Sequence, residues 1–138
     1  MPTVVTDYFK LEEGRQNIDL SGGDVWNCSL VNEEVSATAI SLKGQQLWSS
    51  ISGTYEASGA GYAYSALPNP GWYDGGSQIQ ILSADDMTWT NVTIESYGVC
   101  IWRASDGLIM GFIDYGLNTA SNGNFTINWN TKGIFNKI

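Results

Sequence analysis

The chain has no histidine among its 138 residues, and it has only two cysteines, three prolines and six basic residues. Without an imidazole the protein cannot hold histidine-based metal sites or proton relays, and Ser-His and Cys-His nucleophile pairs are excluded. The two cysteines, Cys28 and Cys100, lie far apart in apolar runs and show no metal-ligand spacing. We expect two buried, reduced thiols.

Positive charge is also scarce, since six Lys and Arg face 14 Asp and Glu, for a net charge of −8. No basic cluster is present that could neutralise a phosphate backbone, which argues against direct binding to DNA or RNA. No apolar run approaches the roughly 18 residues of a membrane span, and no basic start followed by an apolar run marks a secretory signal. We expect a protein made in the cytosol, with neither nucleic acid nor membrane as a partner.

The composition that remains is 43% apolar and 12% aromatic, with 16 glycines and only 14% charged residues. This length fits one globular domain that buries a core without metal or disulfide. Aromatic residues and glycines favour sheets and tight turns over helices held by ion pairs. The composition therefore favours an all-β class.

Hydrophobic patterns place strands along the second half of the chain. Residues 97–103 are apolar at both alternating sets of positions, which is typical of a central strand covered on both faces. The pair Asp106-Gly107 predicts a turn, and Asn122-Gly123 predicts a second turn, so that three strands between residues 97 and 129 form an antiparallel meander. A phase change predicts a bulge near Asn91.

Earlier in the chain, alternation over residues 24–31 predicts another strand, and Asn32 is placed to cap a short helix over residues 33–42. The predicted fold is mainly β: a single-domain antiparallel β-sandwich or jelly-roll-like barrel with one short helix. Residues 1–20 are interpreted as an N-terminal arm or edge segment, and residues 21–138 as the β-sandwich domain.

The carboxylates form no recognisable acid/base pair. Asp85 and Asp86 are adjacent, so their side chains point to opposite faces of a strand, and we interpret them as caps at the start of the strand containing Met87. A calcium site with Asp74, Asp85 or Asp86 among its oxygen ligands is conceivable, but no loop shows regular ligand spacing. The sequence predicts neither an enzyme nor a cofactor, and residues 59–64 are interpreted as a strand crowded by a neighbouring backbone.

Aromatic residues divide into core and surface candidates. Trp26, Trp89, Trp102 and Trp129 fall inside strand patterns and are predicted to be core. Trp48 and Trp72 lie outside clear strands and could face a partner or a sugar, although an edge of the core is the simpler interpretation. Trp72 and Tyr73, on a Gly- and Pro-rich extended loop, are the best candidates for surface recognition.

A series of short elements occurs in a fixed order along the chain. In that order they are Leu30-Val31, Gly59-Ala60-Gly61-Tyr62, residues 84–90, Ile101-Trp102-Arg103, Asp106-Gly107, Leu108-Ile109, residues 112–116, residues 125–129 and Gly133-Ile134. This order resembles a family of small structural proteins of tailed-phage particles, often found among head genes. The match covers most of the chain after about Asp24 and departs from the pattern before Asp24 and in the loop at residues 68–76.

The resemblance implies a non-enzymatic virion protein, made in the host cytoplasm, that decorates the capsid exterior and cements it. Its implied partner is the major capsid protein, and a homotrimer is the assembly that the resemblance implies. Tyr8, Phe9 and Leu11 would anchor the arm on the capsid, because apolar residues on a polar segment suit a groove or strand-addition contact. The alternative is a carbohydrate-binding β-sandwich of a tail or fibre, with Trp72 and Tyr73 stacking on sugars.

Overall fold

The computed structural model describes residues 3–6, 24–33, 46–69, 71–74, 80–129 and 135–137. It is mainly β, which confirms the predicted class, while the sandwich or barrel stays a prediction. The elements in chain order are β1 (Thr3–Val5), β2 (Trp26–Val31), a 3-10 turn η1 (Trp48–Ser50), α3 (Ser52–Tyr55), β3 (Ser65–Ala66), β4 (Gly71–Asp74), β5 (Gln80–Ser83), β6 (Met87–Arg103), β7 (Ile109–Ile127) and β8 (Phe135–Lys137).

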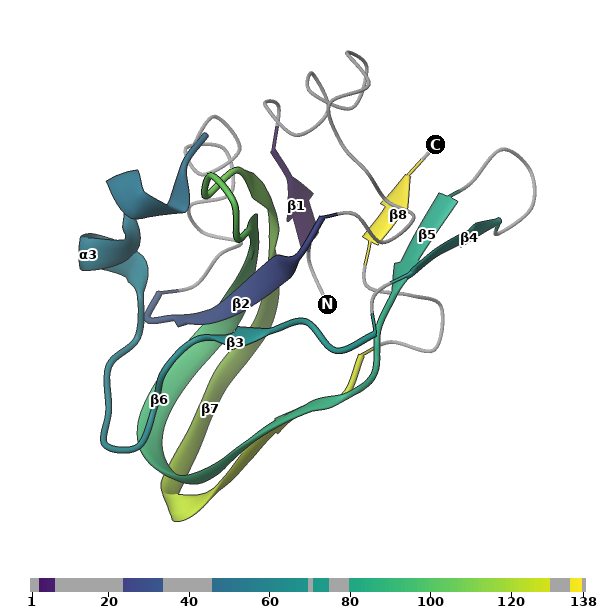
Figure 1. The fold of residues 1–138 in the computed structure, drawn as a ribbon. Coiled ribbons are helices and arrows are strands. Elements are labelled where there is room, and N and C mark those ends of the chain that lie inside the picture. The colour runs from purple at the N-terminus through teal and green to yellow at the C-terminus, as the bar shows by residue number, and fades with distance from the viewer. Residues whose placement is uncertain are drawn as a thin grey trace.

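Two antiparallel sheets are present. The larger has the strand order β1-β7-β6-β2-β3, and the smaller has the order β4-β5-β8. In Figure 1 the smaller sheet lies to the right of the larger one, and α3 lies on the opposite, left side. The predicted helix at residues 33–42 falls outside the described residues apart from Glu33, and the short α3 was not foreseen.

A long hairpin of β6 and β7 forms the centre of the larger sheet. The strands have 17 and 19 residues and pair from Trp102↔Ile109 to Met87↔Ile127. Globular strands usually have 3–10 residues. Four register shifts interrupt the ladder, and such bulges bend a strand and increase its twist. Figure 1 shows both strands bending sharply together at the bottom of the view.

The hairpin confirms two predictions and corrects a third. The turn at Asp106-Gly107 is present, with Gly107 at φ +81°, and Asn91 sits at φ +54° inside the bulge between Trp89 and Val92. The meander of three strands is wrong, because residues 109–127 form one strand. Asn122 does adopt a positive φ of 48°, but it occupies a bulge within β7 and not a turn.

The half of the hairpin next to the Asp106-Gly107 turn is buried on both faces, as predicted for residues 97–103. Val99 and Ile101 belong to one apolar cluster, whereas Cys100 and Trp102 belong to a second on the other face, under η1 and α3. The four tryptophans predicted to be core are 3–9% exposed, and Trp48 is buried too. Burying each such large side chain contributes about 1.5–3 kcal/mol.

The Gly59-Ala60-Gly61 segment lies against β6, which confirms the predicted neighbouring backbone, but residues 59–64 do not form a strand. Ala60 forms an isolated bridge with Thr93, and the Thr93 N–H donates to the Ala60 carbonyl at 3.0 Å. A Cβ on Gly61 would meet the Asn91 carbonyl oxygen at 2.5 Å. Only glycine fits so close to the neighbouring strand.

Candidate functional site

Of the residues predicted for recognition, the structure describes only the backbone of Trp72 and Tyr73. Tyr8, Phe9 and Leu11 lie outside the described residues. Trp72 and Tyr73 were placed on a loop, but they belong to β4, where Trp72 is opposite Leu82 and Tyr73 is opposite Ile81. The loop interpretation is wrong because the flanking Gly and Pro residues conceal a short strand that its partner β5 stabilises.

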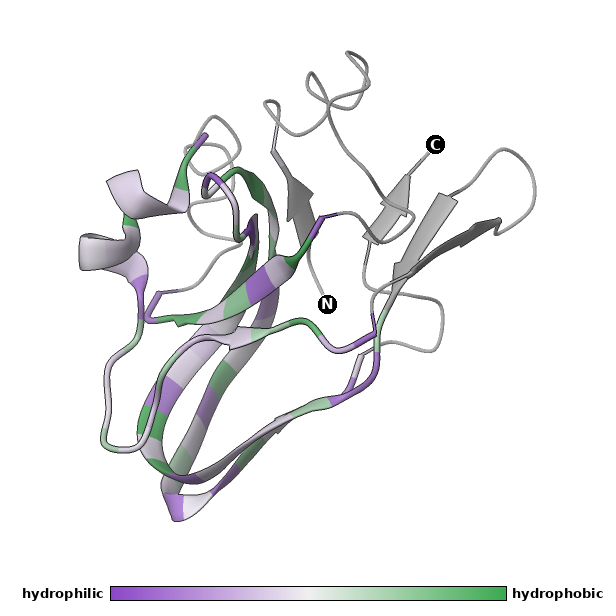
Figure 2. Cartoon of the chain, viewed as in Figure 1, coloured by the Kyte–Doolittle hydropathy of each residue, from purple (hydrophilic) through white to green (hydrophobic). Residues whose placement is uncertain are grey.

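A different surface stands out on the β6–β7 hairpin, on the side away from the core. Over residues 87–95 of β6 and 124–127 of β7, buried residues alternate with exposed ones, most of which are threonines and asparagines. Figure 2 shows this alternation of polar and apolar residues along both strands. We call this surface the threonine face, and it consists of Thr88, Thr90, Thr93, Thr119, Asn124 and Thr126.

Hydrogen bonds across the hairpin hold part of the threonine face in place. The hydroxyls of Thr88 and Thr126, on directly opposite residues, lie 3.0 Å apart. The Thr93 hydroxyl accepts a hydrogen bond from the Asn122 backbone N–H at 3.0 Å. Threonine is also stiff at χ1, so little side-chain entropy remains to be lost when a partner binds.

Charge is nearly absent from this surface. Glu95, opposite Thr119, is the only ionisable residue among the exposed positions of β6 and β7 between Met87 and Ile127. Uncharged hydroxyls and amides each donate and accept hydrogen bonds, and they cost less to desolvate than carboxylates or ammonium groups. The threonine face therefore suits contact with a neutral, hydrogen-bonding surface.

Two hollows flank the hairpin. The first, of about 620 Å³, lies between the 57–58 segment and the hairpin, and Asn32, Ser58, Thr93, Glu95 and Tyr97 contribute to its wall. The second, of about 360 Å³, is lined entirely by β7 and the residue after it, from Tyr115 to Asn128. Both volumes fall within the roughly 300–1,000 Å³ of small-ligand pockets.

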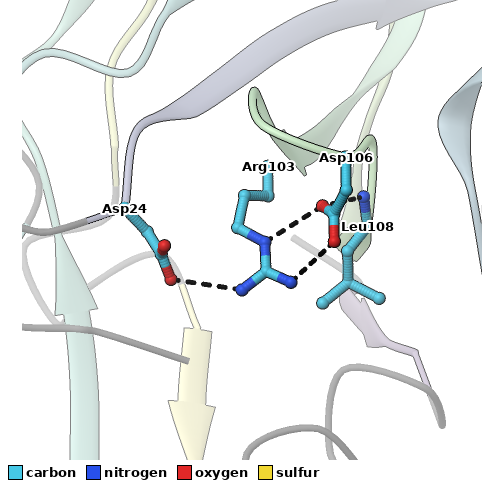
Figure 3. A network of polar contacts seen from close by, with 4 residues as sticks. All are labelled: Asp24, Arg103, Asp106 and Leu108. Atoms are coloured by element: carbon cyan, nitrogen blue, oxygen red, sulfur yellow. Dashed lines mark hydrogen bonds and ion pairs between the residues drawn. The ribbon is translucent and has the colours of Figure 1, made fainter. Parts of the chain in front are cut away.

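Arg103 is the one basic residue whose side chain is described in the structure, and its guanidinium is paired with two aspartates of the same chain. Its Nε and Nη2 donate to the two oxygens of Asp106 at 3.0 and 2.8 Å, and Nη1 lies 3.3 Å from Asp24 (Figure 3). These hydrogen bonds lower the pKa of Asp106 and raise that of Arg103. Asp106 also accepts from the Leu108 N–H, so the network fastens the start of β2 to the β6–β7 turn.

The Asp85-Asp86 pair is structural, but not as predicted. Asp86 Oδ1 accepts from the Trp129 backbone N–H at 3.1 Å, and the Asp85 carbonyl accepts from the Trp129 indole at 2.8 Å. The Asp85 carboxylate accepts from the Asn69 amide. These aspartates therefore bind residues distant in the sequence, where we had expected bonds to amides one or two positions on.

Neither thiol is available for chemistry. Cys28 and Cys100 are fully buried and free, and burial raises the pKa of both thiols far above the usual range. Their strands are neighbours, but Cys28 is opposite Ile101 and Cys100 is opposite Ser29. Since consecutive residues point to opposite faces of a sheet, the two thiols lie on opposite sides and cannot pair.

Metal ligands do not gather in the described part of the chain, which contains no group of three or more Cys, Asp or Glu side chains able to hold an ion. Among the described residues, no helix is long and apolar enough to cross a membrane.

In the sequence, the threonine face corresponds to the outward-facing positions of the strand alternation around Asn91, whose inward-facing positions include the predicted core residue Trp89. Thr88, Thr90 and Thr93 alternate with Met87, Trp89 and Val92 on either side of the bulge. Comparison of the chain with protein-family models, curated proteins and solved structures gives no significant match.

Proposed function

We propose that the chain is a non-enzymatic structural protein of a tailed-phage particle that binds the outer surface of the head and stabilises it as a decoration, or cement, protein. The proposed partner is the major capsid protein. The observation that carries the contact is the threonine face, a preordered and nearly uncharged surface on the bent hairpin. That the protein belongs to a phage particle is inferred from the resemblance of its sequence to small structural proteins of tailed phages.

The packing around the hairpin supports a rigid contact element. Trp89, Val92, Phe125 and Ile127, which alternate with the threonine face, are 0–7% exposed within the larger apolar cluster. A contact surface whose backbone and side chains are already ordered loses little entropy on binding. Such a surface can gain affinity from many small hydrogen bonds to a repeated protein lattice.

The available chemistry supports a role without catalysis. The sequence has no histidine, both thiols are buried, and the hydroxyls of Tyr62 and Tyr115 are hydrogen bonded, to Glu56 and Ser96 respectively. Burial raises the pKa of both tyrosines well above the usual value. A nucleophile or general base would need a group poised near neutral pH.

The charge supports the outside of the particle over the inside. A chain of net charge −8 would be repelled by packaged nucleic acid, and the guanidinium of Arg103 is already paired with Asp24 and Asp106. We therefore place the protein on the capsid exterior, after synthesis in the host cytoplasm.

Binding to purified particles that lack the protein tests this proposal. The wild-type chain should sediment with heads, whereas a Thr88→Lys/Thr90→Lys variant should not, because it places two ammonium groups where the partner must desolvate them. Thr54→Lys, on exposed α3, is the matched control and should bind as wild type. Immunogold electron microscopy should show regular labelling over the head, and labelling confined to the tail would contradict the proposal.

The role of the N-terminal arm in particle binding must be tested by substitution and not by deletion. Removing residues 1–20 would delete β1, which pairs with β7, and Thr6, which is fully buried and donates to the Ile109 carbonyl. We propose that Tyr8, Phe9 and Leu11 anchor the arm on the capsid. A triple change of these three residues to serine should weaken particle binding without changing the melting temperature, and unchanged binding would remove the arm from the contact.

A second candidate, a carbohydrate-binding module of a tail or fibre, is favoured by the hollow beside β6. Its wall combines the partly exposed Tyr97 ring with the polar side chains of Asn32, Ser58 and Thr93. An aromatic face with nearby amides and hydroxyls suits a sugar ring. A glycan array in which Tyr97→Ala abolishes a wild-type signal would support this candidate, and loss only in Trp72→Ala would move the site to β4.

A further inference from the structure

Among the described residues, the outer edge of β7 is paired over only a short stretch. On the side away from β6, β1 covers Gly111 to Ile113, and the Thr6 N–H donates to Met110. From residue 115 to residue 127 the described part of the chain offers no strand on that side, although β6 pairs along the other side as far as Ile127. An unpaired edge of this kind is a template for another strand.

The 360 Å³ hollow lies along this edge. Its lining includes five consecutive residues, 124–128, together with Tyr115, Asn118 and Thr119. Consecutive side chains of a strand point to opposite faces of the sheet. No residue of β6 contributes to this lining, although β6 pairs with the same segment, so the hollow lies on the outer side of β7, which is the position that an added strand would occupy.

Charge identifies the occupant as a second copy of the chain. Residues 115–131 contain no Asp, Glu, Lys, Arg or Pro, in a protein of net charge −8. Copies of such a protein repel one another over most surfaces, because negative charges of one copy meet negative charges of the other. The β7 edge avoids this penalty, and it lacks the charged residues and prolines that natural proteins use to block edge pairing.

The bulges of β7 restrict pairing to one segment. Gly116 and Asn122 have positive φ angles and lie where β7 carries extra residues relative to β6. Residues 123–127 follow the last extra residue of β7, and the register shift opposite them adds a residue to β6, between Trp89 and Val92, and none to β7. We propose that this segment pairs antiparallel with itself in a second copy, about a two-fold axis at Phe125.

This register has specific consequences. Asn124 lies opposite Thr126 of the second copy on the solvent-facing side, where an amide and a hydroxyl form a neutral pair. Phe125 lies opposite its own counterpart on the core side. The pairing makes one continuous sheet and joins the two threonine faces, so a dimer engages the proposed lattice with two linked contacts.

Sedimentation of the full chain over a range of concentrations tests the pairing. The wild type should form a dimer. An Asn124→Lys/Thr126→Lys variant places like charges opposite each other twice per dimer and should weaken the dimer at least about tenfold, which corresponds to about 1.4 kcal/mol. An Asn124→Lys/Thr126→Glu variant places opposite charges across the two-fold axis and should restore it.

Controls separate this result from misfolding and from the proposed function. Thr54→Lys/Thr90→Lys adds the same charge away from the edge and should leave the dimer intact, and melting temperatures should confirm that each variant folds. A wild-type monomer or trimer at all concentrations would overturn the pairing, as would a dimer that survives the double-lysine change or is not restored by the Lys/Glu change. Because Asn124 and Thr126 also belong to the threonine face, particle binding is tested separately with Thr88→Lys/Thr90→Lys, which should lose particle binding and keep the dimer.

Discussion

Gly59→Ala tests the close approach between the 57–61 segment and β6. A Cβ on Gly59 would overlap the Thr93 carbonyl oxygen and lie 3.0 Å from its carbon and 3.2 Å from the Ile94 Cα. All three atoms belong to the backbone of β6, which is paired with β7 and cannot give way as a side chain can. The 57–61 segment would have to move outward.

The cost has two parts. Forcing extra volume into a packed contact costs about 1–3 kcal/mol, and losing the hydrogen bond from the Thr93 N–H to the Ala60 carbonyl costs about 0.5–1.5 kcal/mol. The free energy of unfolding should therefore fall by about 1.5–4.5 kcal/mol. At about 3–5 °C per kcal/mol, the melting temperature should fall by about 5–20 °C.

Gly53→Ala is the matched control, because nothing lies within 4 Å of a Cβ on that exposed glycine of α3. Alanine is favoured over glycine in a helix by up to about 1 kcal/mol, so this variant should be neutral or slightly more stable. Calorimetry measures both, and hydrogen exchange at the Thr93 amide reports the local opening. Equal melting temperatures for the two variants, or an amide as protected in Gly59→Ala as in wild type, would refute the close approach.

Three further predictions follow from buried and paired groups. Ser29→Ala removes the buried hydroxyl that accepts the Trp102 indole N–H at 3.0 Å, so urea unfolding should show a loss of about 1–3 kcal/mol, whereas exposed Ser49→Ala should show none. Asp106→Asn should cost about 1 kcal/mol at pH 7, discounted because Asp106 is half exposed. Arg103 lowers the pKa of Asp106 in the folded state, so the wild type has this extra stability above the ordinary aspartate pKa of about 3.9 and loses it as the pH falls through the folded pKa. If the wild type stayed more stable than Asp106→Asn at the lowest pH, the pairing would be contradicted. Cys28 and Cys100 should resist a thiol reagent in the native protein and both react in denaturant, and a native disulfide found by mass spectrometry would show that they share a face.

Local patterns predicted the parts of the fold that local chemistry decides. Alternation identified β2 and the buried half of β6, and Asp106-Gly107 identified the hairpin turn. The short α3 has only four residues and no apolar repeat, so nothing in its sequence marks a helix. Its place is set by Trp48 and Ile51, which pack against the sheet.

Non-local pairing explains why Asn122-Gly123 was misread. An Asn-Gly pair supplies a positive φ equally well for a hairpin turn and for a bulge. The choice depends on the partner strand, and β6 extends back to Met87, so it pairs with residues on both sides of Asn122. The residues near 122 in the sequence do not show how far β6 extends, so they cannot distinguish a turn from a bulge.

The same bulges connect the fold to both proposed contacts. They bend the hairpin so that Trp89 and Phe125 join the apolar cluster that contains Val99 and Ile101, which leaves the threonines on the outer side. They also divide the outer edge of β7 into short stretches, of which β1 covers residues 111–113 and the last is residues 123–127. A straight hairpin would expose a long regular edge and invite unlimited strand addition, whereas this bent one restricts addition to a segment of about one short strand.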